Sequence, residues 1–248
     1  MSLNKKKIVI FSGAGLDRES GVLTFRDCKD GLWNNHRIED VATPAGWGKN
    51  REAVLTFYNE RRRQLPDVVP NDGHKLIASL EKDYEVINLT QNVSDLLERG
   101  GATNVIHLHG ELTKARGSLY SHKTSPVDHV IDIGYNDINI GDKCVHTGSQ
   151  LRPHIVWFGE MPFGVDKGYQ AIRDADYLVV IGTSLNIGYT LDMLAEAKDD
   201  CKVFYIDPEP APILGKYTGK SVTYMKYGGS EGMVKFIEKL NTLETCEK

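Results

Sequence analysis

Four short, continuous apolar segments limit what this chain can fold into. They are rich in Val, Ile and Tyr, and each stops at small or polar residues: KIVIFSGAG, YEVINLTQN, DYLVVIGTS and KVFYIDPEP. Strands that are apolar on both faces suit a parallel sheet covered by helices on both sides. Helical patterns such as DGHKLIASLEK and LDMLAEAKDD lie between them, which is typical of right-handed β-α-β units. The sequence therefore predicts an α/β fold with a Rossmann-like, doubly wound parallel sheet.

Two segments interrupt this alternation. Residues 31–70 have a helical pattern, with REAVLTFYNERRRQL the clearest helix, and residues 112–152 are rich in Gly, Asp, Ser and His without periodicity. We expect these two insertions to form a smaller domain. Residues 1–30, 71–111 and 153–248 are then expected to form the Rossmann-like domain.

Charge and hydropathy narrow the classes of partner. The 34 acidic and 30 basic side chains give a formal net charge of −4, which provides no field to concentrate nucleic acid. The apolar segments are far shorter than the about 20 residues of a membrane helix, and the N-terminus has no hydrophobic targeting segment. We therefore expect no nucleic-acid or membrane partner and a cytoplasmic location.

The turn Gly13-Ala14-Gly15 directly follows the first apolar segment. In doubly wound sheets, ligands bind beyond the carboxyl ends of the strands, where glycines let backbone N–H groups approach a pyrophosphate. The tripeptide alone also fits a turn that exists only for packing. The polar and aromatic residues that follow, from Glu19 to Arg26, favour nucleotide binding.

Five motifs in this order resemble the sirtuins, the NAD-dependent protein deacylases: GAGLDRESGVLTFRD, TQNVSD, VIHLHGEL, RPHIVWFGE and IGTS. The resemblance extends from Lys7 to Leu240 and is greatest to bacterial members of the family. It implies a Rossmann-like large domain, a small domain built from two insertions, and NAD and an acyl-lysine peptide or protein that meet in the cleft between them.

The resemblance also implies roles for single residues. His109 stands where sirtuins carry their general base, a role suited to an imidazole that titrates near neutral pH. The alternative is a structural histidine whose hydrogen bonds are made within a loop. His107 is the poorer candidate for the base because it points to the opposite side of an extended segment. Asn92 is the second catalytic candidate. The expected cofactor contacts are Gly13, Ala14, Gly15, Glu19, Thr24, Phe25, Arg26, Gln91, Asn92, Ser94, Gly182, Thr183, Ser184, Asp207 and Gly229.

Two segments resemble the substrate-binding parts of the family. HIVWFGE is expected to present a strand edge to the substrate peptide, with Val156 and Phe158 beside the lysine tunnel, although a core strand would look the same. Tyr58 and Arg61, spaced i, i+3 on one helix face, resemble the subgroup that removes succinyl and malonyl groups. An Arg fork can bind a distal carboxylate. Arg62 and Arg63 are expected to face solvent.

The segment from Leu112 to Arg152 departs from the family, whose members usually hold a structural zinc with four cysteines. Gly117 stands at the expected first cysteine, and Cys144 is the one cysteine left in this segment. A single thiolate cannot build a tetrahedral Cys₄ site, so we expect no zinc and no other metal. A mixed site with His122, His129 and His146 is the alternative, but its spacing follows no zinc pattern.

The cofactor loops also depart from the family. Ser94 replaces an aspartate that contacts the nicotinamide amide, so a strong hydrogen bond is expected to be weakened. Asp17 stands where small residues are usual, and near a pyrophosphate it would need Arg18 or Arg26 to neutralise it. Tyr189 stands where a proline is common.

The resemblance implies an NAD-dependent lysine deacylase that yields nicotinamide, the free lysine and O-acyl-ADP-ribose. The altered Ser94 leaves two alternatives open. One is an ADP-ribosyltransferase or NAD hydrolase with the same fold, and the other is a weakly active or inactive NAD-binding module.

Overall fold

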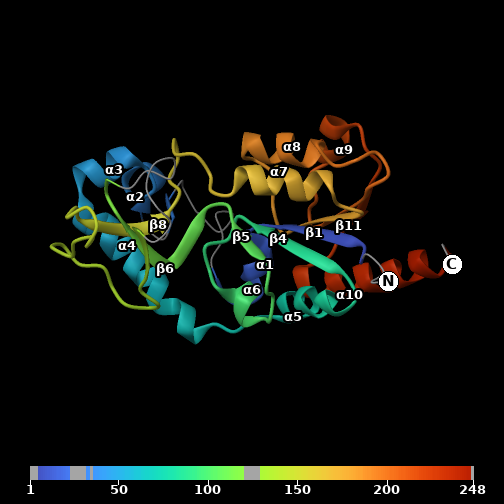
Figure 1. The fold of residues 1–248 in the computed structure, drawn as a ribbon, viewed down its shortest axis with the longest axis horizontal. Coiled ribbons are helices and arrows are strands. Elements are labelled where there is room, and N and C mark those ends of the chain that lie inside the picture. The colour runs from blue at the N-terminus through green and yellow to red at the C-terminus, as the bar shows by residue number, and fades with distance from the viewer. Residues whose placement is uncertain (1–4, 23–31, 34–35, 120–128, 247–248) are drawn as a thin grey trace.

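A six-stranded parallel sheet forms the centre of the larger part of the molecule (Figure 1). The structure, a computed structural model, describes residues 5–22, 32–33, 36–119 and 129–246. The strand order is β11-β10-β9-β1-β4-β5, and every neighbouring pair is parallel. The strands are β1 (Lys7–Ser12), β4 (Glu85–Thr90), β5 (Val105–His107), β9 (Tyr177–Ile181), β10 (Lys202–Ile206) and β11 (Val222–Met225).

The four apolar segments of the sequence form β1, β4, β9 and β10, which confirms the predicted α/β fold. Alternate residues of β1 enter different cores, because successive side chains of a strand point to opposite faces. Val9 and Phe11 belong to one buried cluster, and Ile8 and Ile10 belong to the other. The sheet is therefore apolar on both faces, as continuous apolar strands require.

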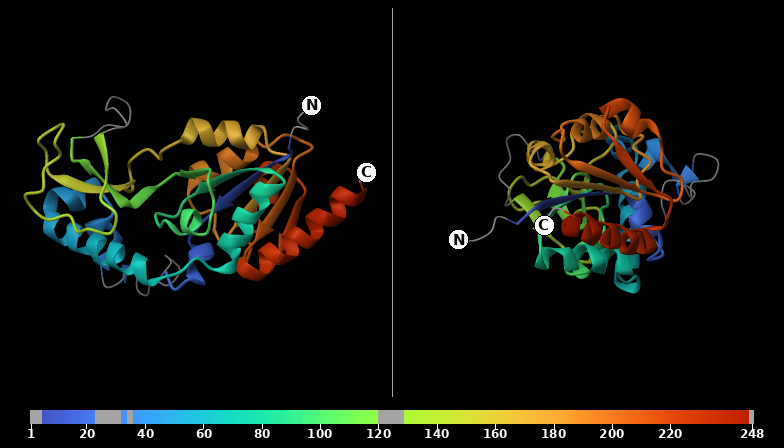
Figure 2. Two further views of the ribbon diagram at one scale, coloured as in Figure 1. Left: turned by 60° about the horizontal axis from the view of Figure 1, so that its bottom comes forward. Right: turned by 90° about the vertical axis from the view of Figure 1, so that its right-hand side faces the viewer.

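Helices cover both faces of the sheet (Figures 1 and 2). One face packs against α7 (Val165–Arg173), α8 (Gly188–Ala195) and α9 (Ile213–Thr218). The other packs against α1 (Ala14–Arg18), α5 (Asp72–Ser79), η3 (Leu80–Lys82), α6 (Leu96–Arg99) and α10 (Gly229–Cys246). Among the helices that the structure describes, none is long and apolar enough to cross a membrane.

A smaller region lies at the opposite end of the molecule from the C-terminus (Figure 2). Its first segment begins with two short strands, β2 (Leu32–Trp33) and β3 (His36–Arg37). The helices α2 (Ile38–Val41), α3 (Pro44–Lys49), α4 (Arg51–Gln64) and η2 (Leu65–Asp67) follow. Its sheet is antiparallel and has the order β7-β6-β8, with β6 (Gly110–Gly117), β7 (Val130–Asp132) and β8 (Leu151–Ile155). The expected domain boundaries at 111/112 and 152/153 fall inside β6 and β8.

Two expectations about this region are wrong. Arg62 does not face solvent: it is 0% exposed, and its Nε donates to the Leu112 carbonyl at 2.6 Å, because α4 packs against β6. The strand expected over HIVWFGE ends at Ile155. Beyond it the chain turns, since the Val156 N–H donates to the His109 carbonyl and the Phe158 N–H donates to the Ala42 carbonyl, both at 2.9 Å.

Candidate active site

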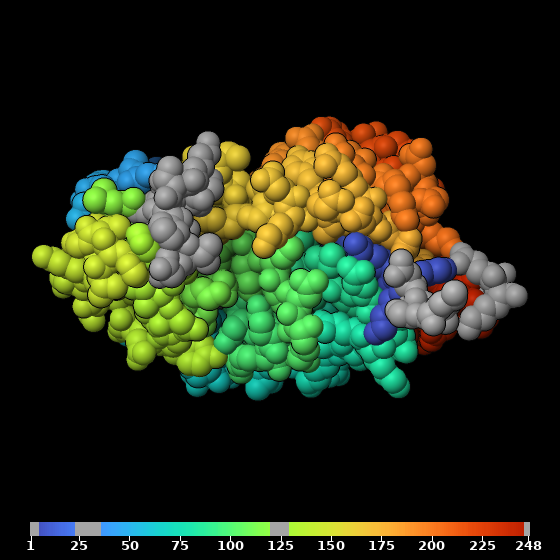
Figure 3. All heavy atoms as spheres, in the orientation of Figure 1, coloured from blue at the N-terminus to red at the C-terminus, as the bar shows by residue number. Residues whose placement is uncertain are grey.

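Two cavities meet where the small region approaches the carboxyl ends of the sheet strands. The larger has a volume of about 460 Å³ and the smaller about 270 Å³. Seen from outside, the small region and the helices α7–α9 form two lobes that flank this part of the molecule (Figure 3). Gln91, Asn92 and His109 line both cavities, so they form a shared wall.

Glycines bring two loops together at the smaller cavity. The turn after β1 lies directly against the loop after β9, with the Gly13 N–H donating to the Ile181 carbonyl at 3.0 Å and the Gly15 N–H to the Gly182 carbonyl at 2.7 Å. A Cβ on Gly13 would lie 2.7 Å from the Thr183 Cβ, and one on Gly15 would lie 2.7 Å from the Gly182 Cα. Glycine is therefore required at both positions for this close approach.

Most of the expected cofactor contacts line the smaller cavity. They are Gly13, Ala14, Gly15, Glu19, Gln91, Asn92, Gly182, Thr183, Ser184, Asp207 and Gly229. The Thr183 hydroxyl donates to the Gln91 Oε1 at 2.8 Å, and the Glu19 carboxylate accepts from the Ser230 N–H at 3.1 Å, which ties α1 to the start of α10. Ser94 lines the larger cavity instead. The expected contacts Thr24, Phe25 and Arg26 lie outside the described residues.

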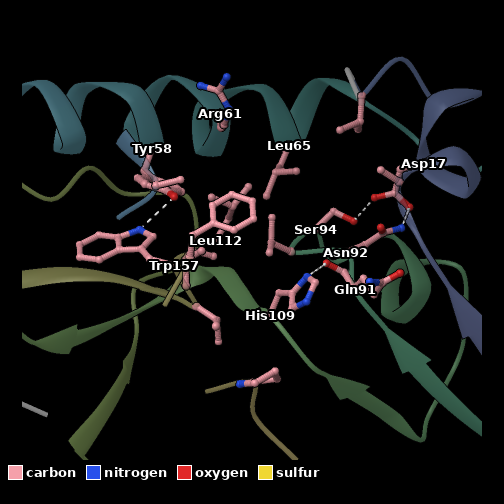
Figure 4. A pocket seen from close by; sticks show the side chains of 18 of the residues that line it. Asp17, Tyr58, Arg61, Leu65, Gln91, Asn92, Ser94, His109, Leu112 and Trp157 are labelled. Atoms are coloured by element: carbon pink, nitrogen blue, oxygen red, sulfur yellow. Dashed lines mark hydrogen bonds between the residues drawn. The ribbon is translucent and has the colours of Figure 1, made fainter. Parts of the chain in front are cut away.

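His109 is held in one tautomer. Its Nδ1 lies 3.0 Å from the Gln91 carbonyl (Figure 4), which can only accept, so Nδ1 carries the proton and Nε2 is a free base. The Tyr189 hydroxyl donates to that Nε2 at 2.8 Å. Burial lowers the pKa of His109 to about 4, although the bond to the Gln91 carbonyl acts in the opposite direction. Burial raises the pKa of Tyr189, so its hydroxyl remains a donor.

His107 has a different environment, although it is only two residues away. Its ring nitrogens contact the Asn92 carbonyl at 2.9 Å and the Glu98 carboxylate at 2.8 Å, and it lines neither cavity. Burial lowers the pKa of His107, but the hydrogen bond and charge of Glu98 outweigh burial and raise it. The structure thus places His109, and not His107, on the cavity wall.

Asp17 does not lie where the sequence suggested. It is 3% exposed and lines the larger cavity, whereas Arg18 lines the smaller one. Its carboxylate accepts from the Asn92 Nδ2 and the Ser94 hydroxyl, each at 2.6 Å (Figure 4). The expected repulsion with a pyrophosphate is therefore replaced by contacts with side chains that follow β4.

Side chains from α4, β6 and β8 line the rest of the larger cavity. Tyr58 and Arg61 of α4 both belong to its lining, but the Arg61 guanidinium turns back along the helix (Figure 4), and its Nη1 donates to the Phe57 carbonyl at 2.9 Å. The Tyr58 hydroxyl accepts from the Trp157 Nε1 at 3.0 Å, and burial raises the pKa of Tyr58. The Arg61 guanidinium stacks 3.3 Å above the Phe57 ring centroid. The apolar part of the wall includes Leu65, Leu112, Ile155, Val156 and Phe158.

The Sir2 family model matches residues 13–188. The chain is 41% identical over 228 residues to the NAD-dependent protein deacylase of Bacteroides thetaiotaomicron, covering 92% of this chain and 95% of that protein. This chain belongs to the Sir2 family. Over 204 residues it is 46% identical to the NAD-dependent protein deacylase of Helicobacter pylori, covering 82% of this chain and 85% of that one.

Solved Sir2 structures share the fold of this Sir2 protein over nearly its whole length. A Sir2 homologue mutant in complex with ADP-ribose has a TM-score of 0.81 at 32% identity and covers 97% of this chain and 94% of its own. A Sir2 homologue in complex with NAD has a TM-score of 0.81 at 31% identity, covering 96% and 91%. Both of those complexes contain an ADP-ribose moiety.

In residues 112–152, a thiol and two hydroxyls lie around the position of the first expected zinc cysteine, Gly117. Cys144 is buried, and a Cβ on Gly117 would lie 2.9 Å from the Cys144 Cβ and 2.6 Å from the hydroxyls of Thr147 and Ser149. One thiol with two hydroxyls does not fit a tetrahedral zinc site, whose ligands are thiolates and imidazoles. The rings of His129 and His146 stack at 4.1 Å, and His122 lies outside the described residues.

One cluster of potential metal ligands does occur elsewhere in the described part of the chain. Ligand atoms of Glu98, His107 and Glu111 lie within 4.8 Å of one another. Both carboxylates already have partners, because Glu98 bonds to His107 and Glu111 forms a 2.7 Å ion pair with Lys114. The Glu98–His107 bond joins α6 to β5, and the Glu111–Lys114 pair lies within β6.

Sequence reasoning missed two features of the site. The Tyr189 hydroxyl contacts the His109 Nε2. In the sequence, Tyr189 was noted only because it stands where a proline is common. Trp157 fixes the Tyr58 hydroxyl, a contact between residues 99 positions apart. Neither contact has a local signal, because each joins residues that are far apart in the sequence.

Proposed function

We propose that this Sir2 protein is an NAD-dependent protein-lysine deacylase that releases nicotinamide and forms O-acyl-ADP-ribose. In this proposal NAD occupies the smaller cavity and extends across the shared wall, and the acyl-lysine enters the larger cavity. The observation that carries the proposal is the unprotonated Nε2 of His109, which accepts from the Tyr189 hydroxyl, on the wall that the two cavities share. Curated relatives over most of the chain's length bear the name NAD-dependent protein deacylase.

The backbone of the smaller cavity suits a dinucleotide. Gly13 and Gly15 add no side chain of their own where the two loops touch, so a pyrophosphate could approach the turn after β1 closely. Asp207 directly follows β10, and both Asp207 and Gly229 line this cavity. In the proposal Asp207 accepts from a ribose hydroxyl and Gly229 contacts the adenine. By the same proposal Thr24, Phe25 and Arg26 would contact the cofactor.

The residues of the shared wall perform the chemistry that the chain itself supplies. When bound, NAD supplies the ribose carbon to which the acyl oxygen bonds as nicotinamide leaves. His109 accepts the proton of a ribose hydroxyl on Nε2, while the Gln91 carbonyl keeps Nδ1 protonated and the ring oriented. Asn92, whose amide is held by Asp17, orients polar groups beside the reacting sugar.

Tyr58 and Arg61 support a finer proposal, that the enzyme accepts short acidic acyl groups such as succinyl and malonyl. Both line the larger cavity. In this proposal the Arg61 guanidinium, which donates to the Phe57 carbonyl at 2.9 Å in the structure, turns toward the distal carboxylate when the substrate binds. The Tyr58 hydroxyl accepts from Trp157, so its own proton is available to donate to a ligand. Leu65 and Leu112 would contact the methylene groups of such a chain. An acetyl group requires none of the polar contacts and is also a substrate in this proposal.

The substrate peptide is proposed to lie along the segment after β8. Phe158 is 53% exposed although it lines the cavity, which is unusual for an aromatic side chain and typical of a binding surface. Val156 lies beside it at the cavity wall. The two side chains would flank the lysine as it enters.

The test is product analysis by mass spectrometry after incubation with NAD and either an acetyl-lysine or a succinyl-lysine peptide. The proposal predicts nicotinamide, O-acyl-ADP-ribose and deacylated peptide in equal amounts. ADP-ribose formed without peptide turnover would instead identify an NAD hydrolase. Unchanged NAD together with measurable NAD binding would identify a non-catalytic module.

A further inference from the structure

A buried carboxylate lies at the edge of the larger cavity, on a helix where small residues are usual in proteins of this kind. Asp17 belongs to α1, and its side chain faces the segment that follows β4 (Figure 4). Ser94, in that segment, donates its hydroxyl to the Asp17 Oδ2 at 2.6 Å. The bond thus connects two segments that are 77 residues apart and that both line the cavity.

Counting hydrogen bonds shows that the carboxylate is not saturated. Its Oδ1 accepts from the Asn92 Nδ2 at 2.6 Å and lies 3.1 Å from the His74 Nε2. The His74 Nδ1 is buried without a partner among the described residues, so Nε2 carries the proton and donates. The Oδ2 receives only the Ser94 hydroxyl from the described residues. Because a carboxylate has about four acceptor positions, one remains on Oδ2 for a molecule in the cavity.

We propose that Asp17 is a positioning residue that aligns Asn92 and Ser94 and accepts an amide N–H from the carboxamide of the cofactor's nicotinamide ring. The inference rests on the proposed function, since it takes NAD as the bound molecule. NAD contains two amino groups, and only the carboxamide belongs to the end that crosses the shared wall. A carboxylate there selects an amide over a carboxylic acid, because two like charges in contact repel.

The bond between Asp17 and Ser94 also explains why position 94 carries a serine and not an aspartate. The bond between Asp17 and Ser94 consists of one carboxylate and one hydroxyl, so it is preserved if the two residue types exchange places. Asp17→Ser alone leaves the donors of Asn92 and His74 without their acceptor. Ser94→Asp alone brings two carboxylates into contact, and these cannot both be ionised at such a distance. Only the wild type and the exchanged protein have a single carboxylate in this pair of positions.

The exchange is the test. The wild type, Asp17→Ser, Ser94→Asp and the double variant are compared for kcat/KM with NAD and for inhibition by added nicotinamide. Each single variant is expected to lose about 10- to 100-fold in kcat/KM, as for the loss of a hydrogen bond to a charged group. The double variant is expected to recover to within about tenfold of the wild type, because the carboxylate returns from the other segment. A double variant no better than the worse single variant overturns the proposal.

Asp17→Asn separates positioning from folding. The amide has the same shape, and its oxygen still accepts from Asn92 and His74 while its NH₂ donates to the Ser94 oxygen. The melting temperature is therefore expected to change little, but the cavity now presents a donor, and inhibition by nicotinamide should weaken by about tenfold or more. Nicotinamide inhibition equal to that of the wild type overturns the proposal. A wild type that does not consume NAD would refute the proposed function instead, so the two failures are distinguishable.

Discussion

The two cavities that meet at His109 are built in different ways. The smaller one lies at the ends of sheet strands, where glycines allow two loops to touch and polar side chains complete the lining. The larger one is formed by side chains that project from α4 and from the segments around β6 and β8. Glycines that let a ligand approach the backbone suit the part of the substrate that every reaction shares, whereas the side chains around the larger cavity can discriminate between acyl groups.

The interactions that support the two cavities also differ. The sheet is enclosed by two apolar clusters, whereas buried charges accompany the apolar cluster of the small region. Arg152 and Arg116 converge on Glu160 at 2.8 and 3.2 Å, and Arg152 stacks 3.2 Å above the Trp157 ring centroid. Burial disfavours ionisation of Glu160, but the Arg152 bond and charge outweigh burial and lower its pKa. Paired buried charges fix geometry more than they add stability.

His109 belongs to both cavities, so its loss should affect every substrate most severely. We expect His109→Ala to reduce kcat at least about 10²- to 10⁴-fold with acetyl and succinyl peptides alike, since the general base is removed. The rate of O-acyl-ADP-ribose formation measures this. NAD binding by calorimetry and the melting temperature serve as controls and should stay near wild type. Undiminished turnover would remove His109 from the mechanism.

A side chain added at a glycine of the smaller cavity should weaken NAD binding equally for every acyl group. In Gly13→Ala the new Cβ would lie 2.7 Å from the Thr183 Cβ and 2.9 Å from the Gly182 oxygen. Strain of about 1–3 kcal/mol corresponds to a rise of about 5- to 100-fold in the KM for NAD. Gly48→Ala is the matched control, because a Cβ there meets nothing within 4 Å. An effect that differed between acetyl and succinyl peptides would contradict the comparison.

A substitution in the larger cavity should affect some acyl groups more than others. Arg61→Met keeps most of the apolar stem but removes the charge, so kcat/KM for succinyl-lysine should fall about 10- to 100-fold while that for acetyl-lysine changes little. Arg63→Met is the control on the same helix, since Arg63 is exposed and paired with Asp137. Equal losses with both acyl groups would refute the carboxylate-binding role.

The pH profile of activity tests the lowered pKa of His109 in the shared wall. The change in activity expected here is the smallest of the four. The base must be unprotonated, and the pKa of His109 is lowered to about 4, so activity should persist as the pH falls through 6.5 and decline only near pH 4. In Tyr189→Phe the neutral imidazole loses a donor, which should raise the pKa of His109 and move the decline to higher pH, with a change of only a few-fold at pH 7.5. Profiles of kcat/KM show this, with circular dichroism at each pH as a control for unfolding. A wild-type decline near pH 6.5 would contradict the lowered pKa.

The sequence predicted the parts of the molecule whose signal is local. The four strands, the Gly13-Gly15 turn and the placement of His109 opposite His107 depend on short patterns and on period-two alternation. β5 and β11, with three and four residues, were too short for such a signal.

The missed features depend on contacts between distant residues. Arg62 was expected in solvent because it belongs to a charged run, but its partner is the Leu112 carbonyl, 50 positions away. Asp17 and Ser94 looked like two separate defects until the fold brought them together. Pair interactions of this kind appear only once the packing of the segments is known.

The most direct test of the central claim is a crystal structure of the protein with ADP-ribose and an acyl-lysine peptide. The account predicts a hydroxyl of the terminal ribose at about 2.6–3.2 Å from the His109 Nε2, in place of the Tyr189 hydroxyl, with the acyl-lysine in the larger cavity. A sugar beyond the reach of His109, with the bond between Tyr189 and His109 intact, would contradict it.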